Sequence, residues 1–300
     1  MKLCAFPSLV QGLFLILVNQ AAMLFIYKNH GYMKRILTWT FAIGVLGILS
    51  SCSRVPITGR SQLHLVPESQ LDQMALTEYH SFLSQNKVVP STSTQAQMVE
   101  RVGQRLAQAI TQYLNQHGYG DRVANYHWEF HLVESKEANA WCMPGGKVVV
   151  YTGILPYTRD EAGLAVVMGH EIAHAIAQHG AERMSEQLLQ QAGGEALAIF
   201  MNEKPQATRD AFLQAYDIGS TVGVMLPHSR KQESEADHLG LIFMALAGYD
   251  PHAALDFWQR MAQANTGQIP AFLSDHPSDA QRIADIRKWI PEAMKYYHPQ

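Results

Sequence analysis

The chain has 300 residues, of which 47% are hydrophobic and 16% charged, with a formal net charge of −3 at pH 7. This length allows an ample hydrophobic core, and the composition is ordinary for a globular protein that also carries an apolar leader. The sequence contains no arginine-rich run, so we do not expect nucleic acid as a partner.

The first 52 residues are predicted to be a leader. Residues 33–51 begin with basic residues, continue as an apolar run and end in small residues, which is the profile of a signal peptide. The end of this segment resembles a bacterial lipobox, in which Cys52 carries the lipid. Residues 1–32 are interpreted as an upstream start-site error, and a transmembrane helix over residues 9–27 is the alternative.

The leader also leads to an expected location. We expect a lipid anchor on Cys52 that holds the protein to the periplasmic side of the outer membrane, if the source is Gram-negative. The residue after the cysteine is Ser53 rather than the aspartate that retains lipoproteins at the inner membrane. Anchoring to the inner membrane is the alternative.

After the leader, residues 53–66 are predicted to be an extended tether and residues 67–300 one domain. Apolar residues at helical spacing predict helices from about residue 67 to 82 and from 98 to 113. Alternating or β-branched segments predict short strands at 126–133, 139–143 and 147–151. Cys142 is the only cysteine after the leader, which excludes an internal disulfide and a cysteine-based zinc site.

The chemistry of the chain is expected in a buried helix that carries the pattern H-E-x-x-H from His170 to His174. Residues four apart lie on one face of an α-helix, so His170 and His174 can bind one ion. Glu171 lies one step round the helix, where it can reach a water at the metal. Zinc, one ion per chain, is therefore the expected cofactor. His179 stands at the wrong spacing for a third ligand, and a position at the helix end or behind a ligand is expected for it.

A second helix, after residue 229, supplies carboxylates. Glu233 and Asp237 are four residues apart and share one face, whereas Glu235 lies about 200° round the helix and is expected to face solvent. One carboxylate added to the two histidines makes a three-ligand zinc site with an open fourth position. Glu233 is the predicted third ligand.

These paired motifs resemble the gluzincin metallopeptidases of the Ste-twenty-four type, and most closely their periplasmic lipoprotein proteases and mitochondrial overlapping-activity proteases. The resemblance covers residues 54–290 and implies a zincin-like fold. We therefore expect an α+β, mostly helical domain with a small sheet beside the H-E-x-x-H helix. It also implies that His170, His174 and Glu233 bind zinc, that Glu171 is the general base, and that Asp237 orients a ligand histidine.

Two further segments gain a role only from this resemblance. Asn139, Ala140 and Trp141 correspond to an edge strand that pairs with substrate. His276, in an Asp-His-Pro loop, corresponds to a histidine that faces the zinc. For His276 two roles stay open: a donor that stabilises the oxyanion, and a fourth ligand that keeps the free enzyme closed, which is the preferred role.

The expected activity is a zinc-dependent endopeptidase that cleaves misfolded or misassembled envelope proteins. Its partners would be such unfolded substrates and the membrane that holds the lipid. An assembly or chaperone-like lipoprotein for outer-membrane proteins, with proteolysis secondary, is the alternative. A closed, purely structural zinc site is a third possibility, and it predicts that removal of the metal unfolds the chain.

Overall fold

The computed structural model describes residues 52–192, 197–216, 230–263 and 280–299, together with Phe272 and His276. The predicted signal peptide and the alternative transmembrane helix over residues 9–27 lie outside this part of the chain. Within the described ranges, no helix combines the length and the apolar character that crossing a bilayer requires.

The described chain begins with a hairpin that packs on the domain. Strand β1 (Cys52–Arg54) pairs antiparallel with β2 (Ser61–Leu63). Val55, in the turn that joins the two strands, is fully buried in the main core cluster. The structure therefore differs from the expected tether over residues 53–66, because apolar and charged side chains of this segment find partners in the domain.

A three-stranded sheet lies at the centre of the molecule. Its strands are β3 (Glu129–Val133), β4 (Ala140–Met143) and β5 (Lys147–Tyr151), in the order β3-β5-β4. Strand β5 is parallel to β3 and antiparallel to β4, so β4 lies at an edge. The three strands predicted from the sequence agree with these positions.

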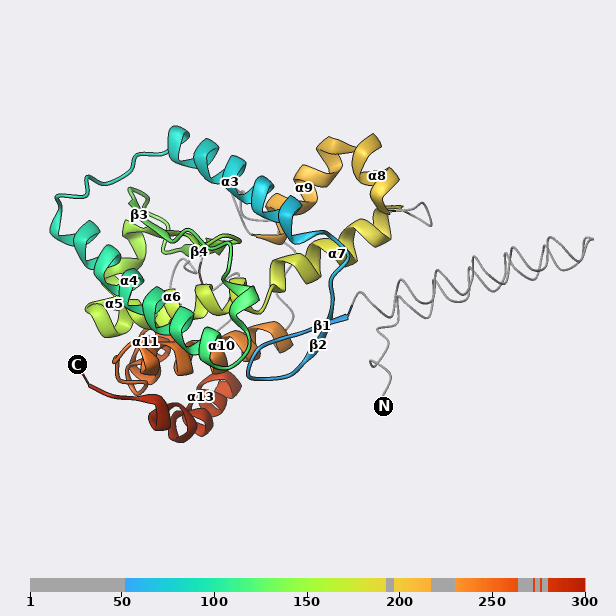
Figure 1. The fold of residues 1–300 in the computed structure, drawn as a ribbon. Coiled ribbons are helices and arrows are strands. Elements are labelled where there is room, and N and C mark those ends of the chain that lie inside the picture. Colours follow the sequence, from blue (N-terminus) through green and yellow to red (C-terminus); the bar gives the residue numbers. More distant parts are fainter. Residues whose placement is uncertain are drawn as a thin grey trace, which may run out of the picture.

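The sheet is covered on both faces, as the buried side chains of β5 require. Alternate residues of a strand point to opposite faces, so Val148 and Val150 share one face and Val149 and Tyr151 the other. The first pair joins the core cluster that contains helices α4 and α6, and the second joins the cluster that contains α3, α7 and α9. Figure 1 shows α3 above the sheet and α6 below it.

Most of the remaining described residues are helical, and the expectation of an α+β, mostly helical fold is confirmed. The helices are α3 (Glu68–Gln85), α4 (Thr94–Gln116), α5 (Leu155–Thr158), α6 (Glu161–Ile176), α7 (His179–Ala192), α8 (Leu197–Glu203), α9 (Pro205–Ala215), α10 (Arg230–Leu246), α11 (Ala253–Gln263) and α13 (Ala280–Ala293), with 3₁₀ turns η1 (Gly120–Arg122), η2 (Thr152–Ile154) and η4 (Met294–Tyr296).

Helix α6 is the buried helix that carries H-E-x-x-H. Asp160 caps its first turn, since its side chain accepts a hydrogen bond of 2.8 Å from the amide of Gly163. The helix ends at Ile176, and Gln178 has a positive φ of 57°. His179 therefore begins a new helix, α7, that leaves in another direction.

Helices α6 and α10 cross at two glycines. A Cβ on Gly240 would lie 3.0 Å from the backbone nitrogen of His170, and one on Gly169 would lie 3.1 Å from the carbonyl oxygen of Gly240. Side chains at these positions would separate the helices, whereas glycine lets the two backbones touch. This close crossing places the histidines of α6 directly opposite the carboxylates of α10.

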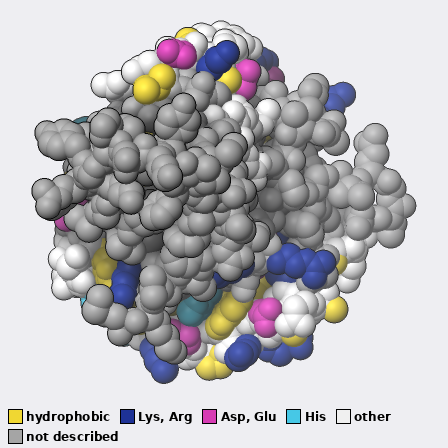
Figure 2. All heavy atoms as spheres, turned by 90° about the vertical axis from the view of Figure 1, so that its right-hand side faces the viewer, with side chains coloured by type: hydrophobic (Ala, Val, Ile, Leu, Met, Phe, Trp, Pro, Cys, Tyr) yellow, Lys and Arg dark blue, Asp and Glu magenta, His cyan; other side chains and the backbone are white. Residues whose placement is uncertain are grey.

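The surface carries charges of both signs. On the face shown in Figure 2, basic and acidic side chains of described residues are interspersed around the rim. Several other charged groups lie inside the protein, among them Glu171, Glu233, Glu235, Asp237 and Arg282, which are each less than 9% exposed. The interior charges are therefore the ones that need an explanation.

Candidate metal centre

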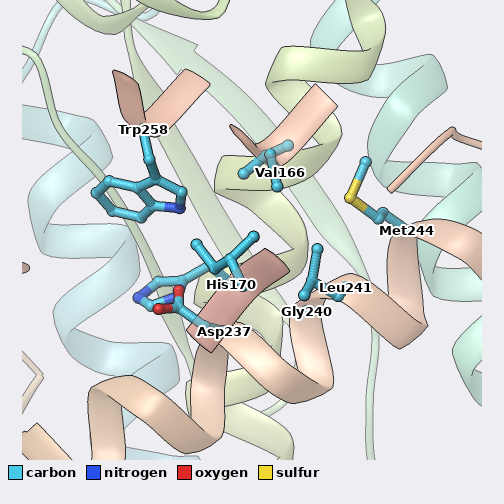
Figure 3. Close-up of a pocket in the computed structure, with 9 residues that line it drawn as sticks. Val166, His170, Asp237, Gly240, Leu241, Met244 and Trp258 are labelled. Atoms are coloured by element: carbon cyan, nitrogen blue, oxygen red, sulfur yellow. The ribbon is translucent and has the colours of Figure 1, made fainter. Parts of the chain in front are cut away.

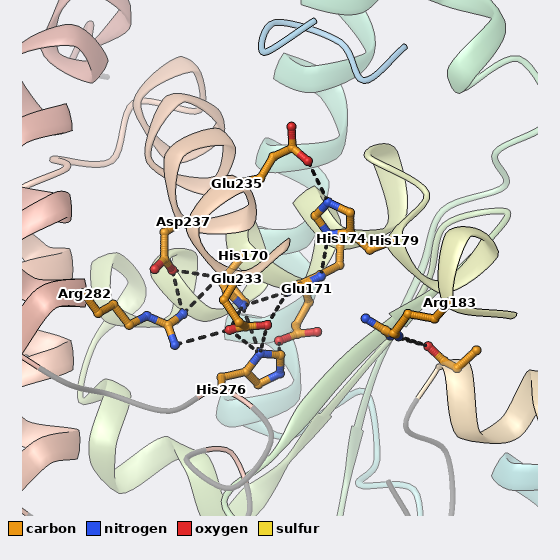
Figure 4. Close-up of polar contacts among 11 residues, drawn as sticks. His170, Glu171, His174, His179, Arg183, Glu233, Glu235, Asp237, His276 and Arg282 are labelled. Atoms are coloured by element: carbon orange, nitrogen blue, oxygen red, sulfur yellow. Dashed lines mark hydrogen bonds and ion pairs between the residues drawn. The ribbon is translucent and has the colours of Figure 1, made fainter. Parts of the chain in front are cut away.

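Four buried side chains converge between α6 and α10. They are His170, His174, Glu233 and His276, and one ligand atom from each lies within 4.8 Å of all the others. The Nε2 atoms of the two α6 histidines are 3.0 Å apart, and Glu233 Oε1 is 3.2 Å from Nε2 of His174. Nδ1 of His276 lies 2.9 Å from Glu233 Oε2 and 3.2 Å from Nε2 of His170. Figure 4 shows these side chains pointing toward one another.

This donor set fits zinc. Two ligand atoms about 2.1 Å from a tetrahedral ion lie roughly 3.4 Å apart. The observed separations between the imidazole nitrogens and the carboxylate oxygens run from 2.9 to 3.5 Å. Imidazole and carboxylate are also ligand types that zinc takes. The residues that the sequence predicted as ligands are thus brought together, and His276 joins them.

His170 is held from behind by a carboxylate. Its Nδ1 lies 2.9 Å from Oδ1 of Asp237, which in turn accepts a hydrogen bond of 2.7 Å from Arg282. With Nε2 directed at the cluster, Nδ1 is the nitrogen that donates to Asp237. Asp237 therefore lies on the Nδ1 side of His170, away from the cluster.

Arg282 links this arrangement to the core. Its guanidinium carbon lies 3.4 Å from the centre of the Trp258 ring, and a second nitrogen is 3.3 Å from Oε2 of Glu233. Figure 3 shows a pocket on this side of His170, lined by the indole of Trp258 and by Val166 and Gly240. Aromatic contact and two carboxylates compensate the burial of this cation.

His174 is held in a different way. Its Nδ1 lies 2.8 Å from Nδ1 of His179, and Nε2 of His179 lies 3.0 Å from Oε2 of Glu235. Glu235 is only 7% exposed, so the expectation that it faces solvent was wrong. It points away from Glu233, as the helical angle requires, but α7 and the N-terminal hairpin cover that side of α10.

A pocket connects the cluster to the edge strand. It is lined by Glu171, His174 and His276 on one side and by residues 139–142 on the other. Nε2 of His276 lies 3.4 Å from Oε1 of Glu171. The side chain of Trp141 is turned to the other face, where it packs edge-on against Phe82 and donates to Tyr151 Oη over 3.3 Å. The indole of Trp141 therefore packs against α3 and β5, while residues 139–142 line the pocket.

Burial and hydrogen bonds act in opposite directions on the pKa values of these groups. Burial lowers the pKa of His170, but hydrogen bonds to Asp237 and Glu233 outweigh it and raise the pKa to about 9. Burial lowers the pKa of His174 well below its ordinary value. Although burial raises the pKa of Glu233, the charge of His276 and hydrogen bonds from the histidines hold it well below the usual range. Glu233 is thus kept as the anion that a cation needs.

Arg282 and Arg60, whose Nε lies 2.5 Å from Oε2 of Glu235, were not identified from the sequence, and Glu235 was placed in solvent. A signal existed for two of the three. Arg282 stands four residues before Ile286 and eight before Ile290, so it lies on the buried stripe of α13. Glu235 likewise precedes Leu239 by one turn of α10. A charge aligned with an apolar stripe indicates a buried ion pair. Arg60 offers no such signal, because it lies in a hairpin.

Comparison with known proteins gives a consistent result. The model of peptidase family M48 matches residues 93–290. The mitochondrial metalloendopeptidase OMA1 of Schizosaccharomyces pombe is 34% identical over 244 residues, which cover 80% of this chain and 67% of that protein. Human metalloendopeptidase OMA1, mitochondrial, is 32% identical over 252 residues, 80% of this chain and 46% of that protein. The beta-barrel assembly-enhancing protease of Escherichia coli K12 is 30% identical over 190 residues, 59% of this chain and 38% of that protein.

These relatives correct the expected location. The ones that match 80% of this chain are named as mitochondrial proteins, which points away from a lipid-anchored protein on the periplasmic side of the outer membrane. The expectation rested on a short lipobox-like segment ending at Cys52, after a basic and apolar run. Basic N-terminal segments serve more than one targeting route, so this pattern did not identify the compartment.

Proposed function

Because this chain belongs to peptidase family M48 and is a zinc-dependent metalloendopeptidase, we propose that His170, His174 and Glu233 bind its zinc and that it cleaves unfolded or misassembled proteins. The observation that carries this assignment is the buried group of imidazole and carboxylate ligands, within 4.8 Å of one another. The matched segment covers less than half of the human relative, so the substrates are part of the proposal.

Glu171 is the proposed general base. It follows His170 on α6, is 5% exposed, and lines the pocket between the cluster and β4. Bound zinc supplies a Lewis acid and lowers the pKa of water toward neutrality. In this role, the carboxylate of Glu171 takes a proton from the attacking water and passes it to the leaving amine. Asp237 accepts the Nδ1 proton of His170, which would leave Nε2 free to bind the ion.

His276 is the proposed fourth ligand of the resting enzyme. Its Nδ1 lies as close to Glu233 and His170 as a ligand atom would, which supports this role over that of an oxyanion donor. Loss of an inhibitory ligand raises basal proteolysis, whereas loss of an oxyanion donor lowers kcat by roughly 10²-fold. The rate of peptide cleavage by His276→Ala therefore decides between them, and a large loss rejects the closed state.

Substrate is proposed to bind as an added strand along β4. This strand is at the edge of the described sheet, and residues 139–142 line the same pocket as Glu171. Backbone hydrogen bonds then give affinity for any extended segment, which suits unfolded substrates. Peptides N-methylated at alternate amides should be cleaved poorly in one register and normally in the other. Equal cleavage of both sets would argue against strand addition.

Within the family, we propose that this chain works as a gluzincin of the Ste-twenty-four type. The combination of His170, His174 and Glu233 with Asp237 behind them supports it. An assembly role with proteolysis secondary is the second candidate, because one relative is named a beta-barrel assembly-enhancing protease. Assays of client folding with an inactive variant separate assembly from cleavage.

The test of the main proposal is Glu171→Gln in the full chain. This variant should keep zinc, measured by atomic absorption, and should lose casein cleavage, because the amide cannot take a proton. A chelator should abolish cleavage by the wild type while the far-ultraviolet circular dichroism stays native. Full activity of Glu171→Gln would reject the assignment, and unfolding on chelation would favour a structural zinc site.

A further inference from the structure

A continuous series of hydrogen bonds runs from His174 away from the metal cluster. His174 Nδ1 meets Nδ1 of His179 at 2.8 Å, and Nε2 of His179 meets Oε2 of Glu235 at 3.0 Å. His179 is the first residue of α7 and is fully buried. Figure 4 shows Glu235 and His179 lined up behind His174 on the side opposite to Glu233.

The series ends in the N-terminal hairpin. Nε of Arg60 lies 2.5 Å from Oε2 of Glu235, and the hydroxyl of Thr58 donates to Oε1 of the same carboxylate. Arg60 also donates two hydrogen bonds, of 2.7 and 2.8 Å, to Glu182 on α7. Both oxygens of Glu235 are therefore held by the turn between β1 and β2, and the same arginine attaches that turn to α7.

The donors and acceptors of this series fit together in only one order. If Nε2 of His174 binds an ion, its Nδ1 carries the proton of the neutral ring. His179 must then accept at Nδ1 and donate from Nε2 to Glu235. A neutral imidazole can do both, because one ring nitrogen accepts and the other donates. Glu235 contacts Thr58 and Arg60 as well as His179, so the series ends at a carboxylate that can accept from all three.

We propose that Thr58, Arg60, Glu235 and His179 form a positioning relay through which the N-terminal hairpin fixes the tautomer and ring orientation of His174 and thereby sets the affinity of the site for zinc. The inference rests on the proposed ligand set. None of the four residues touches substrate or the reacting atoms in this scheme. Residues behind a ligand histidine act by holding its ring and its proton in place.

Zinc affinity is the direct test, measured on the full chain by competition with a fluorescent zinc chelator. His179→Ala should weaken binding by about 10- to 100-fold. His179→Gln, which keeps one acceptor and one donor, should recover part of this loss. Thr58→Val removes one hydroxyl at nearly constant shape and should weaken binding by a smaller factor.

The double variant distinguishes a relay from separate effects. In His179→Ala the connection is cut, so adding Thr58→Val should cause no further loss of zinc affinity. Independent, additive losses would overturn the relay. If His179→Ala fails to fold, Thr58→Val and Glu235→Gln decide by themselves, because unchanged zinc affinity in both overturns it.

A second arginine–carboxylate pair, outside the relay, offers a control. Arg209 makes a bidentate contact with Glu78, with hydrogen bonds of 2.6 and 2.8 Å, as Arg60 does with Glu182. Arg209→Ala should leave zinc affinity unchanged. A loss of zinc affinity equal to that of His179→Ala would show that the relay variants act through general destabilisation of the fold. A wild type that binds no zinc would reject the proposed function itself, whereas tight binding by all variants would reject only the relay.

Discussion

The two histidines of α6 are supported from behind in different ways, although they lie four residues apart on one helix. His170 meets the carboxylate of Asp237 directly, and Arg282 fixes that carboxylate against Trp258. His174 reaches its carboxylate through a second histidine, and the support ends in a hairpin at the start of the described chain. One histidine is thus held by the C-terminal helices and the other by the N-terminal segment.

This difference shows that a single metal motif can depend on distant parts of a chain. The short support is made within α10 and α13, which pack on the core around Trp258. The long support spans 175 residues in sequence between Arg60 and Glu235. Changes in the short support should therefore affect both folding and metal binding, whereas changes in the long support should mainly affect the metal.

The largest effect is expected for Asp237→Ala. This change removes the closest carboxylate of Arg282, a residue that is only 6% exposed. Removing one partner of a buried ion pair costs about 3–5 kcal/mol. Urea unfolding of the metal-free protein measures this loss. A loss below 1 kcal/mol would mean that Trp258 and Glu233 hold Arg282 well enough without Asp237.

Replacing each carboxylate by the amide of the same size removes its charge without leaving a cavity, so these substitutions compare the two supports directly. Asp237→Asn should weaken zinc binding by about 10- to 100-fold, because the carboxylate of Asp237 contacts His170, a proposed ligand, directly. Glu235→Gln should weaken it less, since His179 stands between it and His174. Competition with a chelator gives both values. An equal or larger loss of zinc affinity in Glu235→Gln would contradict this ranking of the two supports.

The helix crossing should matter to both supports at once. Gly240→Ala would place a Cβ 3.0 Å from the backbone nitrogen of His170. Overpacking of this kind costs about 1–3 kcal/mol. The added Cβ would also push α10 away from α6, so zinc affinity should fall together with the urea midpoint of unfolding. Unchanged zinc affinity in a destabilised variant would show that the ligands adapt to the wider crossing.

The smallest effect is expected for Arg209→Ala. The side chain of Arg209 is 47% exposed, whereas that of its partner Glu78 is 9% exposed. Water can replace the exposed guanidinium, and ion pairs open to solvent contribute about 0–1 kcal/mol. The urea midpoint should therefore change little, and zinc affinity should not change. A loss as large as that of Asp237→Ala would show that exposure is a poor guide to the value of these pairs.

Much of the centre was predictable because it depends on local geometry. The spacing of His170 to His174 and of Glu233 to Asp237 places each pair on one helical face. The strands at residues 129–133, 140–143 and 147–151 were also clear from their alternation and β-branched residues. These features are fixed within one turn of helix or one strand.

The remainder depends on contacts between distant segments. Burial of Glu235 requires Arg60 and His179, and neither is a neighbour in sequence or on the same helix. Thr158 and Asp160 are both residue types that cap helices, and at the start of α6 Asp160 rather than Thr158 accepts the amide hydrogen bond. Thr158 instead donates to the carbonyl of Leu155. A sequence shows which residues are able to cap or pair, and the fold decides which of them do.

The glycine crossing of α6 and α10 has a consequence for the order in which the protein becomes active during synthesis. The histidines at 170 and 174 leave the ribosome well before Glu233, and His276 follows later still. Until α10 docks at Gly169, the emerging chain holds a pair of imidazoles without the proposed carboxylate ligand. If Glu233 completes the zinc site as proposed, peptidase chemistry is withheld from the nascent polypeptide and begins only when its C-terminal part has folded.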